Sequence, residues 1–272
     1  MSYENTATER ERVIKETIEF IRSNFKQHFY IARNAISIGD EMLRNREHGI
    51  IYDINNEFGR FLILKLAKNI CRMKSILLLS EHGFARDTIP LLRVMFEEII
   101  DAKYISLDRT RMKDYLDYGD YTYLKILRMG QPYIKKQKDR IASQNIVENS
   151  EDKFQELGKK FNKYRRWSKD DLRKLCETKG IDMKKHYVTM FKLSSQYVHS
   201  SSISDQNYIS RYSTVDVDID VGSNTTWVEE ALLTSVAYFL DLLTFVSNEF
   251  QTVHGEKIEQ LGDELNQLAN LR

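Results

Sequence analysis

Proline and glycine are scarce in this chain, which has 2 prolines and 11 glycines in 272 residues. Both residues end helices and mark tight turns, so their scarcity argues against a fold of many short strands joined by turns. It favours long helices instead. The 30% of charged residues fits helices that each expose a solvated face, and the 42% of hydrophobic residues is enough to fill a core.

Cysteine is nearly absent as well. Cys71 and Cys176 lie far apart, and neither has a cysteine neighbour. This pattern excludes a disulfide framework and a zinc site of paired cysteines, and it indicates a reducing compartment. The apolar runs are too short to span a bilayer, and the charged N-terminus is unlike a signal peptide. We therefore expect a cytoplasmic protein with no membrane partner.

The chain also lacks a charge excess and the familiar cofactor motifs. It has 41 basic and 40 acidic residues, so a nucleic-acid surface would have to be a local patch. Phosphate-binding glycine loops, HExxH and GxSxG are missing. The alternating Asp216, Asp218 and Asp220 imitate a calcium loop, but Gly222 comes one place late and Trp227 stands where the bidentate glutamate belongs. We expect no metal and no cofactor.

Apolar residues recur every three or four positions along most of the chain, the pattern of amphipathic helices. The sequence predicts helices at about 7–46, 56–82, 87–106, 111–127, 132–142, 151–164, 171–180, 183–199 and 226–253. The strict alternation from Val215 to Val221 favours a strand instead, paired with residues 208–212 as a hairpin. Thr226 and Glu229 have the spacing of a capping box that opens the last long helix.

These patterns predict an all-α fold, a multi-helix bundle with long antiparallel helices that forms a single domain over residues 1–254. One small β-hairpin-like insertion lies at about 205–222. Residues 255–272 form an amphipathic helical tail with the heptad positions Ile258, Leu261, Leu265 and Leu268. A helix of this length is marginal alone in water, so the tail should pack on the bundle or on a second copy in a homodimer.

An ion pair is predicted within an apolar helix. Arg93 and Glu97 are one turn apart, among the apolar residues Ile89, Phe96, Ile100 and Tyr104. Charges are rarely buried alone, so the pair should need further polar partners. Two interpretations stay open, a structural clamp and a polar functional site. Tyr197 and His199 are the groups expected to complete one polar pocket with the pair.

His199 is the candidate acid or base. It ends the predicted 183–199 helix, and a helix C-terminus favours the protonated imidazole, so its proton could exchange near neutral pH. The alternative is a histidine that only caps the helix. A metal site made of Glu97, Glu98 and His199 is disfavoured, because no second histidine has a suitable spacing.

A basic run from residue 159 to 169 contains no acidic residue. Its cations are Lys159, Lys160, Lys163, Arg165, Arg166 and Lys169. They could neutralise the phosphates of a nucleic acid while Tyr164 or Trp167 stacks on its bases. The alternative, favoured by the acidic residues on both sides of the run, is a solvated helix face whose aromatic side chains turn into the core.

Two segments resemble a known family. Residues 83–97, GFARDTIPLLRVMFE, are similar to the signature of a bacterial family catalogued only as a domain of unknown function, in which a glycine turn leads to a Leu-Arg-x3-Glu helix. Residues 167–199 are similar to its second signature, a short helix, a glycine and a Tyr…Ser…His helix. The likeness covers about residues 56–227. It implies an all-helical bundle with the characteristic polar residues Arg93, Glu97 and His199.

That family is broadly similar to the HEPN helical bundles, many of which are ribonucleases of toxin–antitoxin or phage-defence systems. The HEPN hallmark is an Arg and a His four to six residues apart on one helix. Arg22 and His28 match it by count, which we interpret as a chance match. In a HEPN relative of this kind, the Arg and the His would come from different helices.

Two functions follow as hypotheses. The first is a metal-independent ribonuclease or RNA-binding effector, with His199 as the acid or base and Arg93 stabilising the charge of the phosphorane. Its partners would be RNA or another protein of the same operon. The second is a non-catalytic helical module that binds a partner protein or a small ligand, with Arg93 and Glu97 structural.

Overall fold

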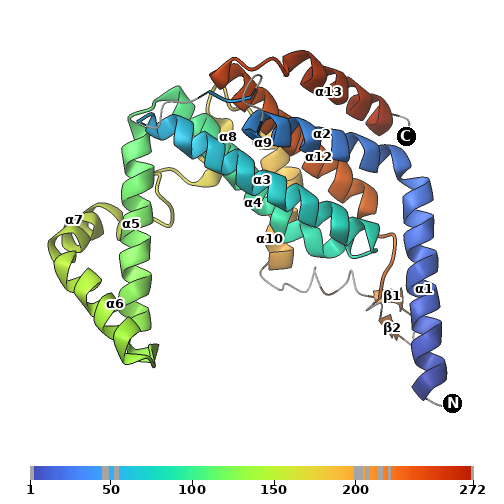
Figure 1. Cartoon of the computed structure of the whole chain (residues 1–272), viewed down its shortest axis with the longest axis horizontal. Coiled ribbons are helices and arrows are strands. Elements are labelled where there is room, and N and C mark those ends of the chain that lie inside the picture. The colour runs from blue at the N-terminus through green and yellow to red at the C-terminus, as the bar shows by residue number, and fades with distance from the viewer. Residues whose placement is uncertain are drawn as a thin grey trace. The chain divides into compact units, whose positions relative to one another are not determined.

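The computed structural model describes residues 3–44, 49–51, 55–198, 205, 209–212, 217–219 and 222–270. Helices make up most of these residues, so the predicted all-α class is confirmed (Figure 1). Two short strands, β1 (Ile209–Tyr212) and β2 (Val217–Ile219), pair antiparallel. They fall within the predicted hairpin-like insertion, but residues 206–208, 213–216 and 220–221 lie outside the described part, so the insertion as a whole stays a prediction.

The helices follow the predicted order. They are α1 (Tyr3–Asn24), α2 (Lys26–Arg44), α3 (Glu57–Glu81), α4 (Ile89–Leu107), α5 (Arg111–Gly130), α6 (Gln137–Asn149), α7 (Glu151–Phe161), α8 (Leu172–Glu177), α9 (Lys184–His186), α10 (Lys192–Val198), α12 (Val228–Phe250) and α13 (Gly255–Asn270). Short 3₁₀ turns, η1 (Ala85–Thr88) and η2 (Gln131–Tyr133), precede α4 and follow α5, and a π-helical turn, η3 (Tyr187–Phe191), joins α9 to α10.

The first predicted helix is two helices in the structure. The break falls at Phe25, between α1 and α2. Ser23 and Asn24 each donate a side-chain hydrogen bond of 2.9 Å to the carbonyl oxygen of Phe20. Such side-chain bonds compete with the backbone ladder and favour a bend or an end of a helix.

The chain forms two compact units, each described here by itself. One consists of Met1–Ile99 and Lys185–Arg272, and the other of Ile100–Lys184. The boundary therefore falls within α4. The division predicted from the sequence, into residues 1–254 and 255–272, stays a prediction.

α12 is the central helix of the first unit, where it packs against α2, α3, α13 and η1. Its length and mean hydropathy of 1.4 would suit a membrane span, but 61% of the apolar window is buried inside the structure. Tyr238 and Phe239 are almost inaccessible to solvent, and the Tyr238 ring centre lies 5.5 Å from that of Phe96 on α4. We interpret α12 as a core helix, and the cytoplasmic location stays a prediction.

Two glycines permit close approaches in this unit. A Cβ on Gly39 would lie 3.0 Å from the Phe239 ring and 3.1 Å from Ile70, so the glycine lets α2 approach α12 and α3. Gly83 follows α3 with a φ of 78°, which glycine adopts without strain. A Cβ there would lie 2.2 Å from Ser223 Oγ. Gly83 thus lies in the turn that follows the end of α3.

The predicted capping box of α12 is wrong. The helix begins at Val228, and the residue before it, Trp227, has a φ of 68° and provides no side-chain cap. The Asn224 side chain instead accepts a 2.9 Å hydrogen bond from the backbone N–H of Thr226, which forms an Asx turn. A local turn therefore replaces the cap that Thr226 and Glu229 would have made.

α13 packs on α2 and α12 within the first unit. Three of its heptad positions are buried, Ile258, Leu261 and Leu265. The prediction was that these positions pack on the bundle or on a second copy. In the structure they pack on the bundle, against α2 and α12.

The second unit is built around α5. Tyr121 of α5 and Leu157 and Phe161 of α7 form a small buried cluster. Ion pairs join the two helices at the edges, where Lys153 contacts Asp120 and Lys160 contacts both Asp114 and Asp117. In Figure 1, α6 and α7 lie together on one side of α5.

Replacing Leu261 with alanine should lower the free energy of unfolding by about 2–4 kcal/mol, because it leaves a cavity between α13 and the bundle. Thermal or urea unfolding would measure the loss. The matched control is Glu259→Ala on the exposed face of α13, which should stay within about 0.5 kcal/mol of the parent. Equal stability of both variants would show that α13 contributes nothing to the fold.

Candidate functional site

α4 carries charged residues on two of its faces. Arg93 and Glu97 form the predicted ion pair, with 3.0 Å between Nε and Oε1. Their side chains are 21% and 38% exposed, so the pair lies at the surface of the unit rather than inside it. The buried carboxylate of this helix is Glu98, whose side chain is 11% exposed. The expectation that Arg93 and Glu97 form a buried pair is therefore wrong. The buried carboxylate of α4 belongs to the next residue, Glu98.

Arg93 connects α4 to the helix that follows the π turn. Its Nη1 donates a hydrogen bond of 3.1 Å to Ser195 Oγ on α10, in addition to the bond from Nε to Glu97. The face of the guanidinium lies 4.7 Å from the ring centre of Phe191, a cation–π distance. The cation therefore contacts residues of three elements, Glu97 of α4, Phe191 of η3 and Ser195 of α10.

The π turn determines which residues of α10 face Arg93. The N–H of Lys192 bonds to the carbonyl of Tyr187, five residues earlier, instead of four as in an α-helix. The rings of Tyr187 and Phe191 stack, with centres 5.3 Å apart. The wider turn rotates the residues after it relative to a regular helix, and Ser195 faces Arg93. Single π turns occur frequently at functional sites.

A small pocket lies beside Arg93, between α4, η3, α10 and α12. Its wall is mainly apolar and includes Leu92, Phe96, Met190, Phe191, Trp227 and Tyr238. Arg93, Ser194 and Glu230 are the polar residues of the lining. The enclosed space is about 10 Å³, close to that of one water molecule. A larger ligand would therefore have to use the exposed side of Arg93 or displace part of the wall.

Trp227 is the strained residue of that wall. Its φ of 68° lies in the left-handed region, which is unusual for a bulky side chain and costs on the order of 1–3 kcal/mol. Its ring meets that of Tyr197 edge to face, with centres 6.1 Å apart. Backbone strain of this kind clusters at binding sites.

The predicted quartet is brought together only in part. Arg93 and Glu97 meet, and Ser195, which the sequence did not single out, accepts a second hydrogen bond from Arg93. Tyr197 packs on Trp227. His199 lies outside the described residues, so its approach to Arg93 stays a prediction, as does the single polar pocket. The signal that could have found Ser195 was its place in the Tyr…Ser…His segment.

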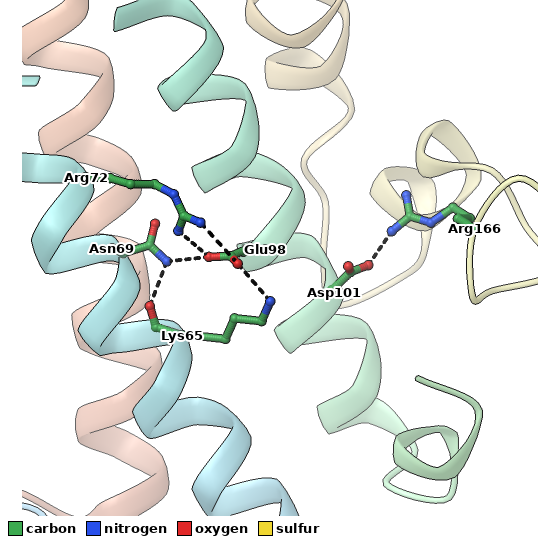
Figure 2. A network of polar contacts seen from close by, with 6 residues as sticks. All are labelled: Lys65, Asn69, Arg72, Glu98, Asp101 and Arg166. Atoms are coloured by element: carbon green, nitrogen blue, oxygen red, sulfur yellow. Dashed lines mark hydrogen bonds and ion pairs between the residues drawn. The ribbon is translucent and has the colours of Figure 1, made fainter. Parts of the chain in front are cut away.

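The buried Glu98 lies at the centre of a second polar group, which Figure 2 shows. Lys65 Nζ donates to its Oε1 at 2.9 Å, Asn69 Nδ2 to its Oε2 at 3.0 Å, and Arg72 Nη1 to its Oε2 at 2.5 Å. All three donors stand on one face of α3, at intervals of four and three residues. Arg72 Nη2 also donates to Oε1 at 3.4 Å, so each carboxylate oxygen accepts two hydrogen bonds.

The cations around Glu98 shift the pKa of its carboxyl group. Burial alone would raise the pKa of Glu98, but the charges and hydrogen bonds of Lys65 and Arg72 outweigh it and hold the pKa below its ordinary value of 4.5. The group contains two cations and one anion, so protonation of Glu98 would leave both cations without a counter-charge.

Two of the six cations of the basic run form ion pairs within the second unit. Lys160 pairs with Asp114 and Asp117, and Arg166 pairs with Asp101 (Figure 2). Trp167 is buried between the rings of Tyr104 and Tyr115, so it cannot stack on a base as proposed from the sequence. The exposed cations of the run are Lys159, Lys163, Arg165 and Lys169.

Cys176 is excluded as a nucleophile. Its side chain is fully buried, and burial raises the pKa of the thiol to about 12. The thiolate that would attack a substrate is therefore not formed at neutral pH.

A known family of sequences matches the part of the chain that contains Arg93, Glu98 and Ser195. Residues 60–214 match the family of unknown function DUF5677, which covers more than half of the chain. The protein belongs to this family. Its matched region contains α4, the π turn and α10. No curated protein and no solved structure matches the chain.

Replacing Glu98 with glutamine should lower the free energy of unfolding by about 3–5 kcal/mol, because Lys65 and Arg72 would keep their charges around a neutral amide. Glu97→Gln, one residue earlier and partly exposed, is the matched control and should cost less than about 1 kcal/mol. Urea unfolding at pH 7 compares them. Similar losses in both variants would contradict the assignment of the structural carboxylate to Glu98.

Comparing the parent with Glu98→Gln also gives a pH test. Because the pKa of Glu98 is lower in the folded than in the unfolded state, its contribution is complete above pH 4.5 and is lost as the pH falls through the folded pKa. The stability difference between the parent and Glu98→Gln should therefore shrink as the pH is lowered from 7 to about 3. A difference that is independent of pH would disprove this.

Proposed function

We propose that this protein is a metal-independent, HEPN-like ribonuclease or RNA-binding effector of bacterial defence, in which Arg93 binds the phosphate at the reacting position. The observation that carries the proposal is the 3.1 Å hydrogen bond from Arg93 to Ser195, across 102 residues of sequence. It joins the two segments that resemble the family's signatures. A contact between them supports one shared site rather than two separate structural motifs.

The chemistry of Arg93 suits this role. Its observed hydrogen bonds use two of the five N–H donors of a guanidinium, and 21% of the side chain is exposed. The remaining donors can bind a phosphate and stabilise the charge that develops on phosphorus. Glu97 and Phe191 hold the planar group in position, which lowers the cost of ordering it when RNA binds.

His199 is the acid or the base of this proposal, and so carries out one of the two proton transfers of the reaction. In metal-independent cleavage, a base removes the proton of the ribose 2′-hydroxyl, which attacks phosphorus, and an acid protonates the departing 5′-oxygen. His199 is four residues after Ser195 in the sequence and directly follows the end of α10. The hydroxyl of Ser195 accepts a bond from Arg93, so Ser195 is a positioning residue rather than a base.

The exposed cations of the basic run would add backbone contacts. Lys159, Lys163, Arg165 and Lys169 remain exposed after the internal ion pairs have formed. Each phosphate contact makes affinity more sensitive to salt. Lys160 and Arg166 are less suited, because their charges are already neutralised by aspartates.

A second candidate is a non-catalytic module that binds a small ligand. The pocket favours it, because an apolar wall with a guanidinium at the rim suits a ligand with an apolar body and an acidic group. The enclosed space of about 10 Å³ means that such a ligand would enter only if the wall moves.

Expression in a bacterial host should inhibit growth for the parent protein but not for Arg93→Ala or His199→Ala, because each removes a group needed at phosphorus. The matched control is Arg173→Ala, which breaks another i,i+4 pair, with Glu177 at 3.2 Å, far along the chain. Arg173→Ala should remain inhibitory. Thermal unfolding of the purified variants checks that all four proteins are folded.

Cleavage of single-stranded RNA in the presence of EDTA gives the direct measurement. The parent should produce 2′,3′-cyclic phosphate ends, and both site variants should be at least about a hundredfold slower. If the parent neither binds nor cleaves RNA, the proposal is wrong. Binding without cleavage, unaffected by His199→Ala, would leave an RNA-binding effector and remove the catalytic role of His199.

A further inference from the structure

One face of α5 is apolar, exposed and regularly spaced. We call it the α5 seam, and its positions are Leu116, Gly119, Tyr123, Ile126 and Gly130 on α5, continued by Tyr133 in the η2 turn. The intervals alternate between three and four residues, the spacing of the contact positions of a coiled coil. The exposed fractions rise along it, from 42% at Leu116 to 63% at Ile126 and 82% at Tyr133. Such a seam usually faces another helix.

The rest of the second unit does not cover this face. Tyr121 and Leu124, which are buried, lie roughly on the opposite side of α5 at 100° per residue. Tyr121 packs against α7. Met112, one heptad before Gly119, is also buried. The stripe is therefore covered at the start of α5 and open from Leu116 onward.

Two glycines in the seam have no close packing neighbour among the described residues. A Cβ on Gly119 or on Gly130 would meet no atom within 4 Å. Gly130 has a φ of −80°, which any residue adopts. Glycine is unfavourable in a helix compared with alanine. A second helix that approaches α5 closely at these points would explain both.

The order of side-chain sizes along the seam indicates the occupant. It runs large, glycine, large, large, glycine, large, and is the same in both directions. A two-fold axis requires such a self-complementary surface. An antiparallel second copy would place Gly119 against Gly130, Tyr123 against Ile126, and Leu116 against Tyr133.

The area is sufficient for a modest dimer. The exposed apolar side chains of the seam and the adjacent Met129 amount to roughly 550 Å² per copy, at the upper end of the range for the largest patch on a monomer. Two copies would bury about 1,100 Å², near the lower limit for specific association. We propose that the α5 seam is a homodimer interface formed by an antiparallel pair of α5 helices, with the two-fold axis near Leu124 and Lys125.

Sedimentation of the full chain tests this. The parent should become dimeric as its concentration is raised to about 0.1 mM, with a Kd that Ile126→Arg raises at least about tenfold. Leu64→Arg on α3 is the matched control, because Leu64 is 60% exposed and Ile126 is 63% exposed, and it should leave the Kd unchanged. A monomeric parent, or a dimer that Ile126→Arg leaves intact, overturns the proposal.

A second pair of variants separates packing from folding. Gly119→Ala should raise the melting temperature of dilute monomer, because alanine favours the helix, yet weaken association at least about fivefold by holding the helices apart. Gly262→Ala on α13 also meets no neighbour and should raise the melting temperature without changing association. If Gly119→Ala and Ile126→Arg instead destabilise a monomeric protein, the seam is covered within the chain and the proposal is wrong.

Discussion

The packing of α3 against α4 depends on the buried carboxylate of Glu98. A carboxylate in apolar surroundings is costly, and it is tolerated here because Lys65, Asn69 and Arg72 supply its hydrogen bonds from one face of α3. Sliding α4 by one turn would separate the anion from all three donors. The network therefore fixes the register between the two helices, the best-attested role of a buried ionic group.

That register leaves Arg93 and Glu97 on another face of α4, at the edge of the unit. A partly exposed ion pair adds little to stability, so its partners can change without loss of the fold. The division of labour follows from the sequence order. Glu98 holds the helix, and Arg93, five residues earlier, is held by Ser195 and Phe191 in a position where solvent reaches it.

Much of the fold and part of the candidate site could be predicted from the sequence. The features that could not be predicted have identifiable physical reasons. Helical periodicity gave the all-α class and the buried seam of α13, and the four-residue spacing gave the Arg93–Glu97 pair. The Glu98 network was missed because Lys65 and Arg72 look like the polar face of an ordinary amphipathic helix, although their common face on α3 was a usable signal. The left-handed backbone of Trp227 depends on tertiary packing and overrode the local capping pattern.

The π turn has a consequence for comparing members of the family. A turn of this kind contains one residue more than the α-helical turn it replaces. A relative that lacks one residue between Tyr187 and Phe191 would have a regular helix there, and every later side chain would be rotated by about 100°. Its counterpart of Ser195 would then point away from the arginine on α4. A one-residue gap in an alignment at this place would mark the relatives whose site is built differently.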